Sequence, residues 1–284
     1  MKNLHIIVNP AAGRDEAILN TLNRVFREHD VAWHVYVTQG LGDAQRLARE
    51  AVAAGADLVA GYGGDGTLME IANGLDDSDT PLGVLPGGTA NSIARELGIP
   101  TDLAQAAELL CQAPRMRRID LGKIGERYFM LHVYTGMRPS QRADRDLKDS
   151  LGIFAYLLST LRVLADPQET RYTLSIDGVE TEQDGIVCFI LNALSVRIDW
   201  SFAKTISPDD GLLDLVLVKK ATLAALPGLI QEKITDEFFQ HWRGREISVR
   251  AEVAQKVWID GEAGGETPFT ALAVPQALRI IVPQ

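Results

Sequence analysis

The stretch GYGGDGTLMEIANGL, residues 61–75, decides how the N-terminal part of this chain is expected to fold. It places five glycines around one aspartate, Asp65, directly after an apolar run and directly before a helical pattern. Glycine lets another group approach the backbone closely, and a helix N-terminus presents N–H groups with a partial positive charge. The stretch therefore predicts a strand, a phosphate-binding loop and a helix in succession.

The loop within this stretch has the sequence GGDGT and begins at Gly63. We expect Gly63, Gly64 and Gly66 to line the loop around nucleotide phosphates, and Thr67 to cap the helix that follows. Asp65 stands where a carboxylate can bind Mg²⁺ or orient the phosphoryl acceptor. A plain strand-to-helix turn, with Asp65 as a cap, is the alternative for this motif on its own.

Short β-rich runs alternate with helical patterns over the first 114 residues or so. The strands are expected at 4–8, 32–37, 57–62 and 81–85, and the helices at 16–28, 43–54, 67–75 and 90–97. Such alternation predicts a parallel sheet with crossover helices, an α/β nucleotide-binding domain. Ligands of such sheets bind at the carboxyl ends of the strands.

Two further loops follow strands of this predicted sheet. One has the sequence NPAAGR, and the other, PGGTANS, repeats the order of strand, glycine loop and helix at a neighbouring strand end. The repeat predicts two phosphate-binding loops at one crevice. The candidate nucleotide-binding residues of these two loops are Asn9, Gly13, Gly87, Gly88, Thr89 and Asn91.

After residue 114 the pattern changes to successive strands separated by tight turns. The turns are expected at Gly125-Glu126, Asp177-Gly178 and Asp210-Gly211, with helical patterns at 151–164 and 222–242. These features predict a mostly antiparallel β-sandwich. The chain therefore divides into an α/β domain, residues 1–115, and a β-rich domain, residues 116–284.

Composition sets limits on the function. The net charge of −10 over 284 residues disfavours nucleic acid as a partner. Cys111 and Cys188 are expected to be buried thiols of a reducing cytosol, and no disulfide framework or metal cluster is visible. The longest apolar stretch, residues 151–165, is shorter than the ~20 residues of a membrane-spanning helix. We therefore expect a cytoplasmic protein.

Six segments in a fixed order carry a family resemblance. They are VNPAAGR, GGDGTLMEIANGL, LGVLPGGTANSIARELGIP, RRIDLGKI, DDGLLDLVLVKK and WIDGEAGG. Together they resemble the diacylglycerol kinase catalytic-domain family, close to soluble bacterial lipid kinases and related to sphingosine kinases. The resemblance implies an α/β domain followed by a β-sandwich, with ATP in the cleft between them.

The resemblance also implies roles for individual acids. It places Asp65 at the phosphates and gives Asp120 a magnesium and water network to support. It assigns Asp260 and the general base Glu262 to the DGE motif, and it implies a structural Mg²⁺ at the DDG turn that involves Asp210. These roles suit phosphoryl transfer, which needs positioned phosphates, Mg²⁺ and a base for the acceptor hydroxyl.

The sequence departs from the family pattern at three places. Met69 stands where most relatives have Asn, and Ser92 stands where many have Asp. Both changes are expected to face the nucleotide crevice. The third departure is LHVYTGMRPSQ, which stands where relatives usually have a glycine-rich strand end close to the lipid. These departures concern the substrate more than ATP binding.

Two basic segments oppose the overall acidity and predict peripheral contact with the inner face of a membrane. One begins at Arg115 and ends at Arg127. The other carries Arg142, Arg145 and Lys148 ahead of the apolar helix expected at 151–164. A basic rim beside an apolar helix suits an anionic membrane surface. The alternative is a solvated loop followed by a helix packed on the β-rich domain.

The leading hypothesis is a lipid kinase that uses ATP and Mg²⁺ to phosphorylate the hydroxyl of diacylglycerol or a similar lipid. One alternative is a nucleotide- or lipid-binding module with impaired catalysis, suggested by Met69 and Ser92. Another is a soluble-metabolite kinase of the NAD-kinase type, which shares the GGDG motif. The sequence leaves the oligomeric state open, with a homodimer among the alternatives.

Overall fold

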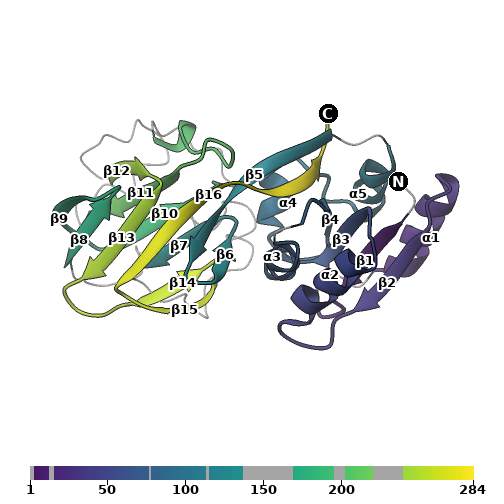
Figure 1. Ribbon diagram of the computed structural model, residues 1–284, viewed down its shortest axis with the longest axis horizontal. Helices are drawn as coiled ribbons and strands as arrows, with labels where there is room; N and C mark the ends of the chain where they lie inside the picture. The colour runs from purple at the N-terminus through teal and green to yellow at the C-terminus, as the bar shows by residue number, and fades with distance from the viewer. Residues whose placement is uncertain are drawn as a thin grey trace. The chain divides into compact units, whose positions relative to one another are not determined.

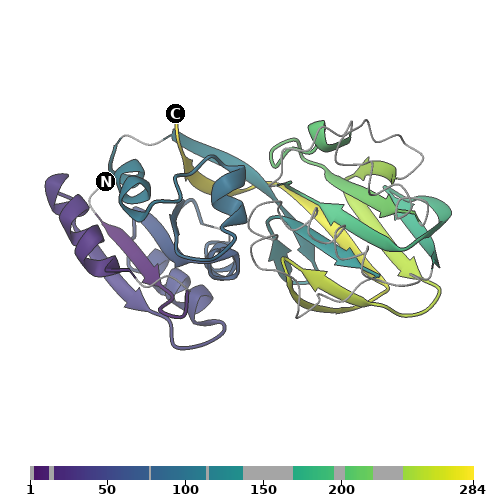
Figure 2. The same ribbon diagram turned by 180° about the vertical axis from the view of Figure 1, so that it is seen from behind.

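We analysed a computed structural model of the chain (Figures 1 and 2). The structure describes residues 3–12, 16–76, 78–112, 115–136, 169–194, 202–219 and 239–284. The chain forms two compact units. Unit 1 contains residues Met1–Ile119 and Gln276–Gln284, and unit 2 contains Asp120–Pro275.

Unit 1 is an α/β layer structure with strands and helices in alternation (Figure 1). Its elements are β1 (Leu4–Val8), α1 (Ile18–Glu28), β2 (Trp33–Val37), α2 (Asp43–Ala53), β3 (Leu58–Gly63), α3 (Asp65–Gly74), β4 (Leu82–Pro86), α4 (Ser92–Glu96) and α5 (Leu103–Cys111). The strands pair in parallel in the order β2-β1-β3-β4. Parallel pairing brings the carboxyl ends of all four strands to one edge of the sheet.

Helices cover both faces of this sheet. On one face α1 and α5 pack together, and their apolar side chains join those of β1 and β3 in a buried core with Phe26, Tyr62 and Leu110. The other face packs against α2 and α3, which lie against each other. Burial on both faces explains why β1, β3 and β4 read as near-continuous apolar runs, whereas the edge strand β2 is partly exposed. The predicted α/β fold of this part of the chain is confirmed.

Unit 2 is a β-sandwich. Its strands are β6 (Arg127–Phe129), β7 (His132–Thr135), β8 (Thr170–Ile176), β9 (Val179–Gly185), β10 (Val187–Leu191), β11 (Leu213–Val218), β12 (Phe239–Gly244), β13 (Glu246–Ala251), β14 (Lys256–Ile259) and β15 (Glu262–Glu266), with a 3₁₀ helix, η1 (Phe202–Lys204). One antiparallel sheet has the order β12-β11-β10-β7-β14-β15. The other contains β13, β8 and β9. Alternate side chains of the two sheets meet in one core, which confirms the predicted sandwich.

Two long strands belong to both units. They are β5 (Arg115–Ile124) and β16 (Phe269–Val282), and they pair with each other. Unit 1 extends past the predicted boundary at residue 115 to Ile119, and it also takes 276–284 from the segment that the sequence pattern assigns to the β-rich domain. Ile280 pairs with Leu82 of β4, a partner far away in the sequence that a local pattern does not reveal.

The structure adjusts several local predictions. Helix α5, which begins after the Asp102 cap, is absent from the predicted elements. Residues 239–242 of the second predicted helical region lie in β12, because they pair with β11 as an extended strand. The rest of that region, 220–238, and the predicted helix at 151–164 lie outside the described residues. The expected turns at Gly125-Glu126 and Asp177-Gly178 are present.

Both cysteines are free thiols, as expected. Cys188 is fully buried and Cys111 is partly buried; burial raises the pKa of Cys111 to about 11. Within the described residues, no helix has the length and apolar character needed to cross a membrane.

Candidate functional site

Three loops of unit 1 leave neighbouring parallel strands at the same edge of the sheet. They follow β1 at Asn9, β3 at Gly64 and β4 at Gly87. In the sheet β3 lies between β1 and β4. The GGDGT loop is therefore the middle of three adjacent loops, and it contacts the loops on both sides.

The GGDGT loop passes directly into helix α3. Gly64 is the N-cap in an extended conformation, and the helix begins at Asp65. The prediction that Thr67 caps the helix is wrong, because Thr67 is already inside the first turn and no side-chain cap is formed. The N–H groups of Asp65, Gly66 and Thr67 belong to the first turn, where an α-helix leaves its N–H groups without intrahelical acceptors. These groups form the phosphate-competent part of the loop.

The Asp65 carboxylate holds the neighbouring loop. Its Oδ2 accepts the backbone N–H of Ser92 at 3.0 Å, and its Oδ1 accepts that of Ile93 at 3.0 Å. Ser92 and Ile93 are the first residues of α4. Asp65 is therefore a cap, as the structural alternative for the motif suggests, but of a different helix from the one it begins. A charged acceptor at a helix N-terminus is favourable, and two bonds fix the carboxylate in one orientation.

The glycines allow the two loops to touch. A Cβ atom added to Gly88 would lie 2.5 Å from the Cα of Gly64, closer than real Cβ contacts. One added to Gly87 would meet the Tyr62 ring at 2.6 Å, and one added to Gly63 would meet Thr67 at 2.6 Å. These three glycines are thus required by loop packing within the protein itself.

Amide side chains complete the connection. Asn9 Nδ2 donates to Thr67 Oγ1 at 2.9 Å, which ties the first loop to the second. In the third loop the Asn91 side chain accepts from Gly88 N at 2.9 Å and donates to Gly88 O at 2.8 Å. Asn91 is buried and has a left-handed backbone with φ of +46°. Of the predicted nucleotide-binding residues, Gly13 lies outside the described residues.

The second glycine loop uses much of its backbone internally. Gly87 N and Gly88 N both donate to Gly63 O, at 2.9 and 3.1 Å. The first two N–H groups of α4 are bound by Asp65. The start of α3 is therefore better suited to receive phosphate than the start of α4. The third loop acts here as the support of the middle one.

The two departures from the family pattern in unit 1 are both buried. Met69 is 7% exposed and Ser92 is 6% exposed. The Ser92 backbone, rather than its side chain, makes the contact with Asp65. A carboxylate at position 92 would stand next to the Asp65 carboxylate, and Ser92 avoids this like-charge pair.

The acids of the DGE motif lie at the turn between β14 and β15 of unit 2. Asp260 has a left-handed backbone, with φ of +48°. Its carboxylate accepts three backbone N–H groups, from Met130 at 2.8 Å, Leu131 at 3.1 Å and His132 at 2.8 Å. Asp260 thereby fixes the turn against the segment that leads into β7.

Glu262 is the more accessible acid of this motif. Its side chain is 49% exposed, and its Oε2 pairs with Arg127 Nη2 at 2.7 Å. Arg127 also donates to the backbone O of Ala263 at 3.1 Å. The turn thus combines one carboxylate bound to backbone and one held at the surface by a guanidinium. Arg127 was not among the predicted site residues, although it lies in the predicted β-rich domain close to a tight turn.

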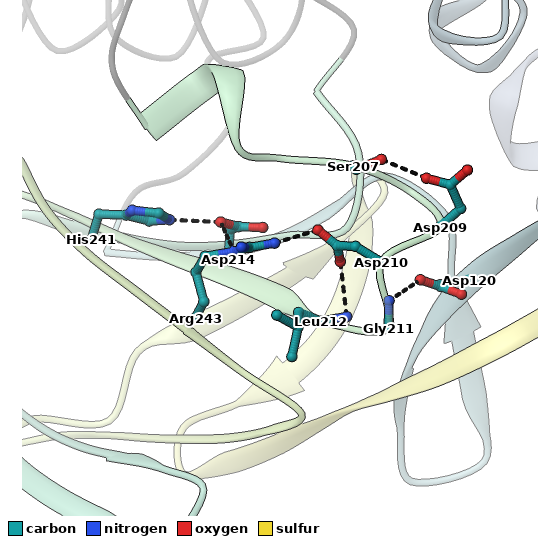
Figure 3. Close-up of polar contacts among 9 residues, drawn as sticks. All are labelled: Asp120, Ser207, Asp209, Asp210, Gly211, Leu212, Asp214, His241 and Arg243. Atoms are coloured by element: carbon teal, nitrogen blue, oxygen red, sulfur yellow. Dashed lines mark hydrogen bonds and ion pairs between the residues drawn. The ribbon is translucent and has the colours of Figure 1, made fainter.

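Asp120 and Asp210 meet at the DDG turn of unit 2, drawn in Figure 3. Asp120, which is 1% exposed, accepts Gly211 N at 2.6 Å, and its own N–H donates to Pro208 O at 2.6 Å. Asp210 accepts Leu212 N at 3.0 Å and forms an ion pair with Arg243. Burial raises the pKa of the Asp210 carboxyl, although Leu212 and Arg243 act in the opposite direction.

The basic segment that begins at Arg115 does not gather as an unopposed positive surface. Arg118 pairs with Asp79 at 2.9 Å, and Arg127 pairs with Glu262. Lys123 lies 4.7 Å from the centre of the Tyr128 ring. The second basic segment, with Arg142, Arg145 and Lys148, lies outside the described residues.

Unit 1 combines a parallel sheet with glycine loops at its strand ends, and unit 2 is a β-sandwich that carries acid turns. Residues 3–124 match the family model described as the diacylglycerol kinase catalytic domain. Residues 132–282 match the model described as the YegS C-terminal NAD kinase beta sandwich-like domain.

Curated and solved relatives agree with these matches. The chain is 31% identical to a diacylglycerol kinase of Bacillus subtilis (strain 168), over 100% of this chain and 97% of the relative. It is 29% identical to a diacylglycerol kinase of Staphylococcus saprophyticus, over 99% of this chain and 96% of the relative. A solved structure named "a putative diacylglycerol kinase from Bacillus anthracis str. Sterne" has 27% identity and a TM-score of 0.85, with 99% of this chain and 95% of that chain covered.

The chain therefore belongs to the diacylglycerol kinase family and is a lipid kinase by class.

Proposed function

We propose that this enzyme transfers the γ-phosphoryl group of ATP to the hydroxyl of diacylglycerol or a closely similar lipid. The observation that carries the proposal is the joined set of three loops in unit 1, in which Asp65 and Asn9 hold the first turn of α3 in place. Relatives named diacylglycerol kinase match along the whole chain and support the choice of lipid.

In this proposal the start of α3 binds phosphate. The N–H groups of Asp65, Gly66 and Thr67 supply the hydrogen bonds, and the helix dipole favours negative charge there. Gly64 and Gly88 keep side chains away from the point where the loops touch. Phosphoryl transfer depends mainly on positioning and charge neutralisation, so a loop held from both sides is suited to it.

Mg²⁺ is part of the proposal as the partner of ATP, where it would neutralise phosphate charge. Mg²⁺ is usually held by one or two carboxylates together with substrate phosphates rather than by an all-protein cage. Asp65 fits this description as a fixed oxygen donor, since a carboxylate that accepts two N–H bonds retains lone pairs. The described residues contain no group of three or more His, Cys, Asp or Glu side chains that could hold a metal without the nucleotide.

Glu262 is the proposed general base. It is half-exposed, whereas the carboxylate of Asp260 already receives three backbone N–H groups. Glu262 would accept the proton of the lipid hydroxyl as that oxygen attacks the γ-phosphorus, and Asp260 would hold the turn that presents it. Asp260 remains the next candidate for the base.

The substrate assay tests this function directly. The purified protein is incubated with ATP labelled in its γ-phosphate, Mg²⁺ and mixed micelles of diacylglycerol, monoacylglycerol or sphingosine, with NAD as a soluble acceptor. We expect label in diacylglycerol. Label in NAD alone would indicate a soluble-metabolite kinase, and label in no acceptor, with ATP binding intact, would indicate a binding module.

Because the proposed substrate is a lipid, the enzyme has to meet a membrane surface. We propose a peripheral contact. Arg118 and Arg127 of the first basic segment are each paired with a carboxylate, which reduces the net positive charge that they offer to such a contact.

A further inference from the structure

The DDG turn of unit 2 is bound by a positively charged side chain of the same chain, Arg243. Arg243 Nη2 pairs with Asp210 Oδ2, and Arg243 Nε lies 3.1 Å from Asp214 Oδ1 (Figure 3). His241 Nε2 lies 2.6 Å from the same Asp214 oxygen. One guanidinium thus connects the turn before β11 to a carboxylate inside β11.

The strand register places Arg243 at this point. Asp214 of β11 is directly opposite Arg243 of β12 in the antiparallel ladder, and Leu213 is opposite Gly244. Side chains of directly opposed residues are neighbours on the same face of a sheet. From this position the Arg243 side chain reaches back to the turn, where Asp210 also accepts Leu212 N.

The surroundings favour a permanent positive charge. The side chain of Asp214 is 2% exposed, that of Asp210 is 27% exposed, and that of Arg243 is 32% exposed. Asp120 adds a third carboxylate, bound to Gly211 N of the same turn. A buried carboxylate is unfavourable without a partner, and a guanidinium presents several N–H donors in a planar fork that can serve two carboxylates at once.

These residues do not fit the structural Mg²⁺ that the family resemblance implies for the turn. A Mg²⁺ site needs oxygen ligands in an octahedral arrangement. The Asp210 oxygens are already engaged by the Leu212 N–H and by Arg243. A divalent ion at this carboxylate would stand next to the guanidinium charge and be repelled by it.

We propose that Arg243 is the built-in cation of the DDG turn, and that the turn keeps its conformation without a divalent ion. Arg243 is in this view a positioning residue. It neutralises Asp210 and Asp214, and through them it fixes the turn that Asp120 holds from the other side. The inference concerns the fold of unit 2 and is independent of the nucleotide and lipid proposed above.

Thermal unfolding of the full chain without nucleotide tests this inference. The wild type should melt at the same temperature in EDTA and in 5 mM Mg²⁺, because EDTA cannot remove the Arg243 side chain. The two melting temperatures should agree within about 1 °C, which is well below the shift expected for loss of a buried ion pair. A fall in the wild-type melting temperature in EDTA that Mg²⁺ reverses would overturn the proposal.

Substitution of Arg243 gives the second arm. Arg243→Gln should lower the melting temperature in EDTA by roughly 5 to 10 °C, because it removes the guanidinium charge from the buried Asp214 and from Asp210. Mg²⁺ should restore part of this loss, since the uncompensated carboxylates then attract a divalent ion. Arg243→Lys retains a positive charge and should melt higher than Arg243→Gln, with little response to Mg²⁺. Arg171→Gln is the matched control, because it removes an exposed ion pair with Asp184 in the same unit.

Binding of Mn²⁺ alone, measured by equilibrium dialysis, keeps the test decisive if Arg243→Gln does not fold. The nucleotide-free wild type and Asp210→Asn should bind the same amount of Mn²⁺. A wild-type Mn²⁺ site that is lost in Asp210→Asn would place a metal at the turn and overturn the proposal. The thermal unfolding arm can also overturn the proposal. It would do so if Arg243→Gln melted at the wild-type temperature in EDTA, or if the melting temperature of Arg243→Gln did not respond to Mg²⁺.

Discussion

The glycine loops of unit 1 and the acid turns of unit 2 both contain Asp-Gly pairs, and the carboxylates of Asp65 and Asp260 both bind backbone N–H groups. The two regions differ in the group that stays accessible beside the aspartate. In unit 1 the Asp65 carboxylate accepts the N–H groups of Ser92 and Ile93, and the backbone at the start of α3 is the proposed ligand of phosphate. In unit 2 Asp260 is bound to three N–H groups and the neighbouring Glu262 side chain stays accessible. The comparison separates acids that maintain structure from an acid available for chemistry.

This difference has a measurable form. Removal of the charge should disturb both folding and turnover at Asp65, whereas at Glu262 it should disturb turnover alone.

Glu262→Gln should lower the rate of lipid phosphorylation by about 10²- to 10⁴-fold, the usual cost of losing a general base. Its melting temperature should change by no more than about 3 °C, since an exposed ion pair contributes about 0–1 kcal/mol. Initial rates at saturating ATP and scanning calorimetry measure the two effects. Arg127→Gln removes the same ion pair but keeps the carboxylate, and should cost less than about tenfold in rate. A rate within threefold of wild type for folded Glu262→Gln would move the base to Asp260.

Asp65→Asn should reduce turnover at least about tenfold and should also destabilise the protein, unlike Glu262→Gln. A hydrogen bond to a charged group contributes about 1.5–3 kcal/mol, and the amide can retain an acceptor for only one of the two N–H groups. Turnover at saturating ATP and Mg²⁺, together with urea unfolding, measures the change. The contrast between the two units would be contradicted if Asp65→Asn kept half the wild-type rate, or if the variant were as stable as the wild type.

Gly88→Ala should destabilise the protein by about 1–3 kcal/mol, the usual cost of forcing an extra methyl group into a packed site. Its Cβ would lie 2.5 Å from the Cα of Gly64. Gly64→Ala is the matched control, because a Cβ there would have its nearest contact at 3.5 Å, with Gly88. Denaturant unfolding of both variants compares them. Equal stabilities would show that close loop packing is not what requires glycine at position 88.

Thr67→Val should cost about 1 kcal/mol, the net value of one hydrogen bond. Asn9→Ala should cost about 1–2 kcal/mol, because it also removes the bond that Asn9 Oδ1 accepts from Ala11 N. The double variant should cost less than the sum, because both changes remove the same bond between Asn9 Nδ2 and Thr67 Oγ1. Thr67→Ser keeps the hydroxyl and serves as the control. Strict additivity in this cycle would mean that the two loops are joined by other contacts.

Much of unit 1 could be predicted from its sequence. The run LHIIV is strand β1 over the residues expected, and the glycine loops lie at the predicted ends of β3 and β4. Local signals suffice there because a buried parallel strand is a continuous apolar run and a loop residue follows directly. The predicted lipid kinase class is confirmed by the family matches.

Contacts between distant segments could not be predicted in this way. Asp65 binds residues 27 and 28 positions away, and Arg243 reaches Asp210 across 33 positions. A local pattern identifies Asp-Gly as a turn but does not name the partner of its carboxylate. For Arg243 the sequence carried no local signal, since the helical pattern expected at 222–242 ends directly before it. Its register against β11 was needed to place it opposite Asp214.

The shared strand β16 has a consequence for the order of synthesis. A ribosome produces residues 276–284 only after all of unit 2 has been made, yet those residues belong to unit 1. During translation, the edge of β4 that pairs with β16 therefore stays unpaired while some 150 residues of unit 2 are synthesised. This interval lasts roughly 10 to 30 seconds at about 5–20 residues per second. Unit 1 is the first to begin folding and the last to be completed.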